Sequence, residues 1–364
     1  MVLKLTLPKL ASAKSLCPPV SPIPAPRPSH YLGLWGLLGV LLFAFLVSLA
    51  LGSVTIPLSE VVTILLGGEP SRAPWRDIVL NFRLPRSLTA MAAGSALAVS
   101  GLQLQALFRN PLAGPSILGI NAGASLGAAL VVLTGGLTGW AAVGWLGQFS
   151  LVGAASLGAA AAMVLVMGVA HRVRNSLALL IFGLMLGYVT TALVTILLHF
   201  SSIDQTLAYL SWTFGSFAGV TWAQIPVLVT IILGGLGLAY LTGKPLNLLL
   251  LGEEQALSLG LSLRLTRLYL ILSSSLLAGT VTAFCGPIAF LGVAVPHLGR
   301  SLFRTLDHRV LIPASILIGA LLALVADGIA QLPGSQVMLP LNAVTALIGA
   351  PVLIGLMLKR QGRL

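Results

Sequence analysis

The chain has 364 residues, of which 57% are hydrophobic and only 8% are charged, and its mean hydropathy is +1.03. Soluble proteins carry about 25% charged residues, so this composition excludes a soluble body and predicts an integral membrane protein. The net charge of +12 comes from Lys and Arg residues scattered between apolar runs. This scatter argues against nucleic-acid binding and is typical of basic loops on the cytoplasmic side of a membrane.

Residues 1–30 are rich in proline, as in CPPVSPIPAPRP, and they lack the apolar core of a signal peptide. We predict that they form a disordered cytoplasmic tail and that residues 31–364 form one transmembrane domain. The two cysteines, Cys17 and Cys285, are too far apart for a metal-binding or disulfide pattern. We interpret Cys285, within an apolar run, as a packing residue.

Ten apolar runs predict ten membrane-spanning helices and an all-α polytopic fold. The predicted spans cover residues 33–53, 86–107, 115–135, 146–170, 177–199, 223–243, 264–285, 288–303, 309–331 and 340–358. Basic residues cluster in the N-terminal tail, after spans four, six and eight, and at the C-terminus. These positions all lie on one side of the membrane if both termini are cytoplasmic.

The loop of residues 54–86 breaks this charge pattern, because it is predicted to lie outside yet holds Arg72, Arg76, Arg83 and Arg86. The Leu-Pro step between Arg83 and Arg86 predicts an extended or turn entry into the second span. Two arginines at a membrane surface can grip carboxylates in a bidentate manner. They can equally reach from a helix end to the interface, and the residues alone do not separate these two interpretations.

The second span and its continuation combine small residues with amides. Gly94 and Gly101 lie two helical turns apart, which favours close helix packing. The amides that follow are costly in lipid, so we expect them to line a translocation path or to bond neighbouring helices: Gln103, Gln105, Asn110 and Asn121. Gly94, Gly101 and Pro111 recur at identical spacing as Gly279, Gly286 and Pro296. This spacing is consistent with inverted repeats, although chance also explains three matches in a Gly-rich chain.

The segment GEEQALSLGLS, Gly252–Ser262, lies in the long loop of about residues 244–263 and predicts a short helix. Glu253 and Glu254 suit the positive end of its dipole, and Gly260 suits its C-terminal stop. Ala256 and Leu259 lie three residues apart and are predicted to share an apolar face. Such a helix is either a docking element or an ordinary capped loop helix.

Sites for other chemistry are missing from the sequence. Gly243-Lys244 is followed by Pro245, so no ATP-binding loop is present. No His, Cys or Asp cluster has metal-ligand spacing, and no nucleophile–base pair is evident, so we predict neither a metal, a cofactor nor an enzymatic site. We interpret His171, His199 and His308 as solvated or packing residues.

Asp327 is the single acid within an apolar run. An ion-coupled carrier usually needs several intramembrane ionisable groups, so we favour a hydrogen-bonded packing role for Asp327 over ion coupling.

Four segments together resemble the FecCD/BtuC-like family of vitamin B12, ferric-siderophore and haem permeases. They are Arg83–Ala124, Leu248–Ser262, Cys285–Arg300 and Ala343–Lys359, and the likeness extends over most of the chain after about residue 30. The family supplies the membrane subunits of type II ABC importers. The resemblance implies a ten-helix, inverted-repeat permease in a bacterial inner membrane that works by alternating access.

The resemblance also implies partners and roles. The expected partners are two copies of an ATPase subunit, an extracytoplasmic substrate-binding protein and a second permease copy or paralogue. Arg83 and Arg86, helped by Arg72 and Arg76, would dock the binding protein. The coupling helix that contacts the ATPase would comprise Gly252, Glu253, Glu254, Ala256, Leu259 and Gly260. The cargo expected is a ferric siderophore, with haem and cobalamin as alternatives.

Three positions interrupt a predicted span or depart from the family pattern. Pro296-His297 is predicted to break the eighth span, where the family re-enters the membrane near the ATPase. Gln331 stands where the family tends to carry a docking arginine, and Met338-Leu339-Pro340 replaces its typical Glu-Leu-Pro. We assign Pro111, Pro296 and His297, with the glycines and amides above, to the translocation path or to helix packing.

Overall fold

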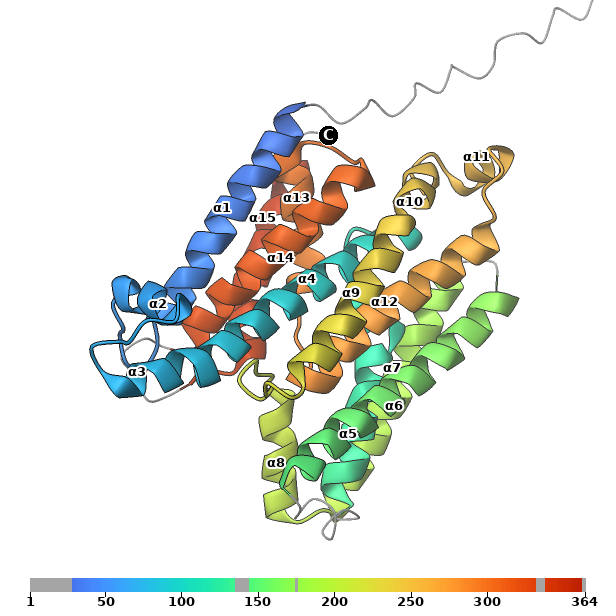
Figure 1. Ribbon diagram of the computed structural model, residues 1–364. Helices are drawn as coiled ribbons and strands as arrows, with labels where there is room; N and C mark the ends of the chain where they lie inside the picture. Colours follow the sequence, from blue (N-terminus) through green and yellow to red (C-terminus); the bar gives the residue numbers. More distant parts are fainter. Residues whose placement is uncertain (1–27, 135–143, 174–175, 332–337, 362–364) are drawn as a thin grey trace, which may run out of the picture.

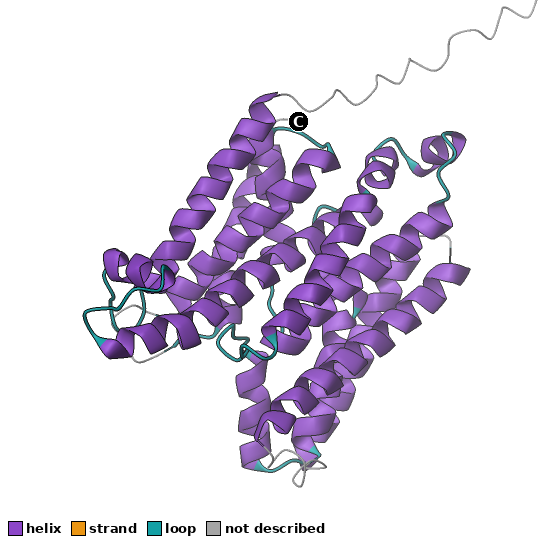
Figure 2. Cartoon of the chain, viewed as in Figure 1, coloured by secondary structure: helices purple, strands orange, loops and turns teal. Residues whose placement is uncertain are grey.

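The computed structural model describes residues 28–134, 144–173, 176–331 and 338–361. Within these ranges the chain is helical and forms no strand (Figures 1 and 2). The long helices are α1 (Pro28–Ala50), α4 (Leu84–Leu107), α5 (Ile120–Leu133), α6 (Gly144–Arg172), α7 (Ser176–Phe200), α9 (Ile225–Leu241), α12 (Leu263–Cys285), α13 (Leu291–Phe303), α14 (His308–Ala330) and α15 (Leu341–Gln361). The predicted tail lies almost wholly outside the described residues.

Short helices connect the long ones. They are α2 (Leu58–Leu65), α3 (Ala73–Asp77), the π-helix η1 (Ile78–Arg83), the 3₁₀ turn η2 (Pro115–Leu118), α8 (Ile203–Thr213), α10 (Gly243–Leu249) and α11 (Glu253–Ser258). The predicted outer loop of residues 54–86 is therefore largely helical, and α3, η1 and α4 follow one another without a gap. Pro85 lacks an N–H for the α-helical ladder, which accounts for the π-helical turn just before it.

Each of the ten predicted spans coincides with a long helix. Among the described residues, six helices are long and apolar enough to cross a membrane, and the bent pair α9–α10 makes a seventh. This pair bends by 49°, at the position where Pro245 removes the N–H that would bond the Leu241 carbonyl. The shorter helices α5, α13 and α15 occupy predicted spans three, eight and ten.

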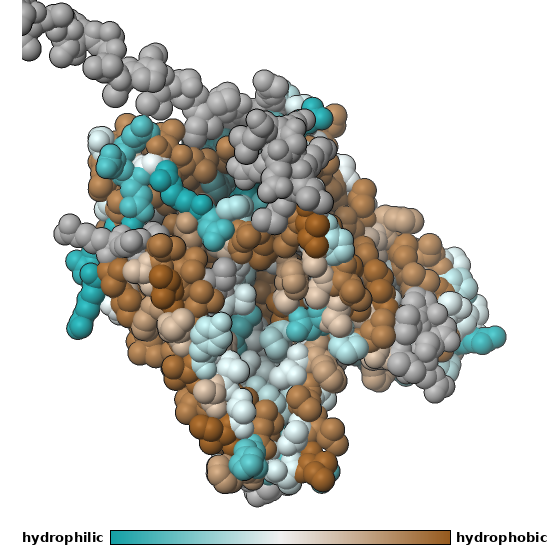
Figure 3. All heavy atoms as spheres, turned by 180° about the vertical axis from the view of Figure 1, so that it is seen from behind, coloured by the Kyte–Doolittle hydropathy of each residue, from teal (hydrophilic) through white to brown (hydrophobic). Residues whose placement is uncertain are grey.

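Helix α4 occupies the interior of the bundle. In the most apolar 18-residue stretch of the span that contains α4, 83% of the residues are buried. The corresponding stretches are 11% buried in α1 and 22% buried in α6 and α7. Apolar side chains cover most of the face seen in Figure 3, as expected where lipid surrounds the outer helices. A Cβ at Gly94 would overlap the Gly319 carbonyl of α14, and one at Gly101 would overlap the Gly292 carbonyl of α13. These glycines therefore serve helix packing.

The bundle has two ends, which we name after their short helices. The α11 end carries α10, α11, the start of α1 and the end of α15, and the α2 end carries α2, α3 and α8 (Figure 1). Helices α4 and α14 run between the two ends side by side. Both described chain ends thus lie at the α11 end.

Two predictions about prolines are wrong. The chain does not enter the second span in an extended or turn conformation at Leu84-Pro85, because Arg83 and Leu84 are helical and η1 continues directly into α4. Helix α13 continues through Pro296 without a break, because Pro296 lies in its second turn and removes one backbone bond only. The equal spacing of glycines does not mark equivalent positions. Gly101 lies inside α4, whereas Gly286 ends α12 with a left-handed φ of 76°.

Candidate functional site

The predicted short helix after the sixth span is present as α11. Glu253 and Glu254 occupy its first turn. Gly260 has a left-handed φ of 84°, its N–H bonds the Leu257 carbonyl at 2.9 Å, and the Leu261 N–H bonds the Ala256 carbonyl at 3.0 Å. These two bonds form a Schellman motif that terminates the helix, as the glycine predicted.

The exposed face of α11 differs from the one predicted. Ala256 is fully buried within the chain, whereas Leu257 and Leu259 are 54% and 59% exposed. Glu253 pairs with Arg267 of α12 at 2.7 Å, and Glu254 is exposed. Ala256 therefore anchors the helix, and the surface open to a partner includes Glu254, Leu257 and Leu259. The spacing of Ala256 and Leu259 did not reveal Leu257, because sequence spacing does not tell which face of the helix packs against the rest of the chain.

Several residues from the segments that resemble the permease family lie close together near α11. Gln105, Pro111 and His297 help to line a cavity of about 390 Å³ that opens near the end of α10. The Gln105 amide donates to the Val293 carbonyl at 3.1 Å, and His297 Nε2 bonds the Pro111 carbonyl at 2.9 Å. Gln105 thus ties the end of α4 to α13, and His297 of α13 holds the loop that follows α4.

The other amides have separate roles. Asn110 Oδ1 accepts the Leu112 N–H at 2.9 Å and so forms the turn after α4. Asn121 lies apart on α5, where its Oδ1 accepts the Thr282 hydroxyl of α12 at 3.1 Å. Gln103 is buried and donates to the Thr242 hydroxyl at 3.3 Å. These bonds support helix packing, and the translocation path assigned to the same residues stays a prediction.

Arg83 is not the surface residue that docking requires. Its side chain is buried, with one terminal nitrogen donating to the Leu49 and Ala50 carbonyls at 2.8 and 2.9 Å and the other to the Val54 carbonyl. The last carbonyls of α1 have no partner within the helix, and Arg83 supplies their donors. Arg83 therefore caps α1 in this structure, and its role in docking a binding protein stays a prediction.

Arg86 is also engaged inside the chain. Its Nε and one terminal nitrogen both bond the Asp327 carboxylate at 2.9–3.0 Å, and the two side chains are 12% and 4% exposed. Gln331 donates to the same carboxylate at 2.9 Å. The bidentate grip expected from Arg86 thus acts on α14 rather than on a partner. Asp327 has the hydrogen-bonded packing role favoured by the sequence.

The exposed arginines of the α2 end are Arg72 and Arg76. The Arg72 guanidinium lies 5.3 Å from the centre of the Trp75 ring, a distance typical of a cation–π contact. Glu60 accepts bonds from the Ser71 hydroxyl and N–H, and these bonds lower the pKa of its carboxyl. Of the four arginines predicted to dock a partner, these two have the required exposure.

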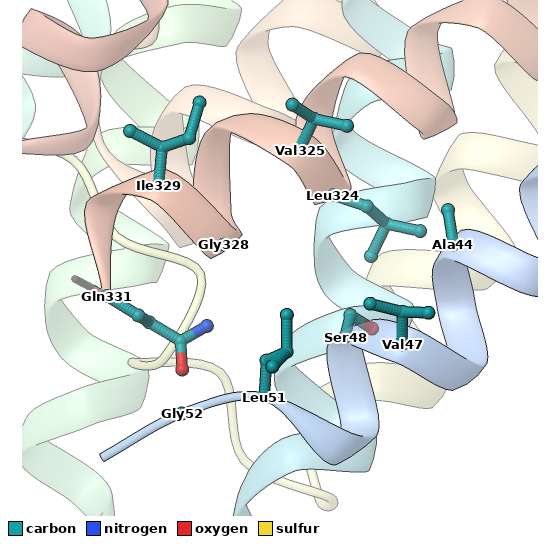
Figure 4. Close-up of a pocket in the computed structure, with 10 residues that line it drawn as sticks. All are labelled: Ala44, Val47, Ser48, Leu51, Gly52, Leu324, Val325, Gly328, Ile329 and Gln331. Atoms are coloured by element: carbon teal, nitrogen blue, oxygen red, sulfur yellow. The ribbon is translucent and has the colours of Figure 1, made fainter. Parts of the chain in front are cut away.

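Two cavities lie at the α2 end. One of about 700 Å³ is lined partly by Arg83, Arg86, Trp222 and Gln331. The other, of about 330 Å³, lies between α1 and α14 (Figure 4) and has almost entirely apolar walls with Gln331 at its edge. A charged cargo would find few polar partners in the second cavity.

The remaining candidates concern metals and histidines. Among the described residues, no group of three or more His, Cys, Asp or Glu side chains could hold a metal ion. His308 is buried and bonds Asn247 of α10, a residue that sequence reasoning missed. The only signal for Asn247 was an unexplained amide within the predicted loop of about residues 244–263.

This arrangement of helices is found in known proteins. The model of the FecCD transport family matches residues 40–359. The chain is 39% identical over 332 residues to a vitamin B12 import system permease protein, BtuC, of Klebsiella pneumoniae, covering 91% of this chain and 94% of that protein. BtuC of Salmonella typhi is 39% identical over 290 residues, which are 77% of this chain and 83% of that protein.

A solved structure agrees with these relatives. A metal-chelate type ABC transporter in an inward-facing conformation superposes with a TM-score of 0.79 and 29% identity, covering 91% of this chain and 99% of that one. The matches span nearly the whole bundle, including both ends described above. The chain belongs to the FecCD transport family and is a multi-pass membrane permease subunit of an ABC importer.

Proposed function

We propose that this permease imports a corrinoid of the vitamin B12 type. The support for this cargo is the name of the relatives that match at 39% identity over up to 91% of the chain. Our sequence-based expectation was a ferric siderophore, which we keep as the second candidate because the solved relative is of the general metal-chelate type. Haem is the third member of the same cargo class.

We further propose a division of labour between the two ends. The α11 end faces the cytoplasm and contacts the ATPase through Glu254, Leu257 and Leu259, which are exposed on a short helix tied to α12. The α2 end faces outward and receives the substrate-binding protein, aided by the exposed Arg72 and Arg76. Both chain termini are then cytoplasmic.

The importer is proposed to contain two permease copies, or a copy and a paralogue, together with two ATPase subunits. ATP binding and hydrolysis on those subunits would shift the permease between outward-open and inward-open states, because each nucleotide state binds one conformation better. Residues 31–364 act as one domain in this scheme. The observation that carries the proposal is the α11 helix, which ends in a Schellman motif at Gly260 and leaves Leu257 and Leu259 exposed.

The test is uptake into vesicles that contain the permease, the ATPase and the binding protein. Cobalamin, a ferric siderophore and haem are offered separately, with and without ATP on the ATPase side. We expect accumulation of cobalamin that requires both ATP and the binding protein. Accumulation of the siderophore alone would show that the proposed cargo is wrong while the proposed ATP-driven import stands. Uptake driven by a proton or sodium gradient without ATP would contradict both proposals.

A further inference from the structure

A buried hydrogen-bond network joins α10 to α14 at the α11 end. Asn247 of α10 is 7% exposed, and Asp307 and His308 at the start of α14 are 4% and 2% exposed. The Asn247 amide donates to Asp307 Oδ1 at 2.6 Å. Its Oδ1 accepts the His308 backbone N–H at 2.8 Å and bonds His308 Nδ1 at 2.8 Å. Because a backbone N–H can only donate, it fixes the orientation of the amide.

This network completes the N-terminal cap of α14 from another helix. Asp307 is the N-cap residue, and its Oδ1 also accepts the Arg309 N–H at 2.9 Å. The first N–H groups of a helix lack partners within it, so the Asn247 carbonyl oxygen supplies one. Removing the Asn247 side chain would take away one of the two donors to Asp307 Oδ1 and the partner of the buried His308 N–H.

Helices α10 and α14 also pack directly, because a Cβ at Gly243 of α10 would lie within contact distance of Ile312 of α14. The cavity of about 390 Å³ is lined by Leu249 and Leu250, at and just after the end of α10, and by His308 of α14. The cavity leaves part of this contact unfilled, and beside it the directional bonds of Asn247 help to set the relative position of the two helices. Gly252, where α11 begins, follows Asn247 by five residues.

Helix α14 is also fastened at its far end. Its 23 residues span roughly 35 Å at about 1.5 Å per residue. At the α2 end, Asp327 holds Arg86 of α4 through the bidentate pair described above. Helix α14 is thus bonded to α10 at the α11 end and to α4 at the α2 end.

We propose that Asn247 is a positioning residue that makes α14 follow the movement of α11. The proposal rests on the proposed role of α11 as the ATPase contact and names the bond through which that contact reaches the bundle. A displacement of α11 pulls α10, and the network transfers it to the start of α14. Arg86 and Asp327 then carry it to the outer end of α4.

The experiment uses the complete importer in vesicles and measures cargo uptake and ATP hydrolysis together. The primary variant is Asn247→Leu, which removes both hydrogen-bonding groups at similar size. We expect hydrolysis to stay near wild type and cargo moved per ATP to fall about tenfold, a typical size for a lost coupling between sites. Ser95→Ala is the matched control, because it removes a different buried bond to α14, that to the Ile316 carbonyl at 3.0 Å.

A charge exchange keeps the test decisive if Asn247→Leu fails to fold. Asn247→Asp places a second carboxylate against Asp307. It should lower the cargo moved per ATP at least as much as Asn247→Leu does. Adding Asp307→Asn removes the second carboxylate and restores one amide opposite one carboxylate, but the amide at position 307 cannot both donate to residue 247 and accept the Arg309 N–H at the same atom. We therefore expect part of the lost cargo moved per ATP to return. A double variant no better than the single one would overturn the proposal. The proposal would also be overturned if Asn247→Leu lost hydrolysis and uptake in parallel. It would likewise be overturned if Asn247→Leu and Ser95→Ala moved the same amount of cargo per ATP.

The same preparation separates this proposal from the role of α11. ATPase binding to the permease is measured with Glu254→Lys and with Asn247→Leu. We expect the first to weaken binding and the second to leave it unchanged. Unchanged binding in Glu254→Lys would contradict α11 as the contact, whatever the Asn247 variants do.

Discussion

Both ends of the bundle hold charged residues that pair within the chain beside others that stay exposed, but the paired residues are buried more deeply at the α2 end than at the α11 end. At the α2 end, Arg83 and Arg86 turn inward, where Arg83 caps α1 and Arg86 pairs with Asp327. At the α11 end, Glu253 turns inward to Arg267 while Glu254 stays exposed beside apolar residues. Proximity to a helix end therefore does not tell whether a charge faces a partner. The unpaired groups of neighbouring helices decide it, because buried carbonyls and carboxylates must find donors.

The inward use of charge at the α2 end is tested most strongly at Asp327. Asp327→Leu leaves Arg86 buried without its counter-charge, and we expect a loss of about 3–5 kcal/mol in the free energy of unfolding. Arg86→Met in the same chain removes the unpaired charge and should recover most of that loss. Unfolding of the purified permease in detergent measures both. A double variant as unstable as Asp327→Leu would contradict a pairing role.

Arg83 gives the next largest expected effect. Arg83→Met removes the donors for the Leu49, Ala50 and Val54 carbonyls, and we expect a loss of about 2–4 kcal/mol in the free energy of unfolding. Arg76→Met serves as the control, since Arg76 is exposed. Equal stability of the two variants would show that Arg83 does not cap α1. Charge reversal at Arg83 is a poor docking test for the same reason, because it would disturb the fold first.

The α11 end should respond in binding rather than in stability. Glu254→Lys reverses an exposed charge, and we expect ATPase affinity to fall about tenfold, equal to about 1.4 kcal/mol. The unfolding of the permease should not change. Glu253→Lys should lower both, because it also breaks the pair with Arg267. Two variants with the same stability and the same affinity would remove the distinction between an inward and an outward glutamate.

The smallest effect is expected at the exposed arginines of the α2 end. Arg72→Glu with Arg76→Glu should slow association of the binding protein a few-fold at low salt and less at high salt, because exposed charges are screened. Association rates at two salt concentrations provide the measurement. A slower rate that is independent of salt would show that these arginines act through contacts other than charge.

Local patterns predicted most of the fold, because a span and a capped helix depend on neighbouring residues. The ten apolar runs coincide with ten helices, and the Gly252–Ser262 segment forms α11 with its glycine stop at Gly260. The site was predicted less well where a partner lies far along the chain. Arg83 bonds residues about 30 positions away, and Arg86 and Asp327 are 241 apart. No local pattern contains such a pair, and for the same reason Asn247 was missed.

Cross-linking from the two ends tests the central claim most directly. Single cysteines are placed at Leu257 on α11 and at Arg76 at the α2 end, in a chain whose own Cys17 and Cys285 are replaced by serine. A short bifunctional reagent is then applied to the assembled importer with its ATPase and binding protein. We predict that the cysteine at position 257 links to the ATPase alone and the one at position 76 to the binding protein alone. Links from position 257 to the binding protein, or from position 76 to the ATPase, would contradict the account.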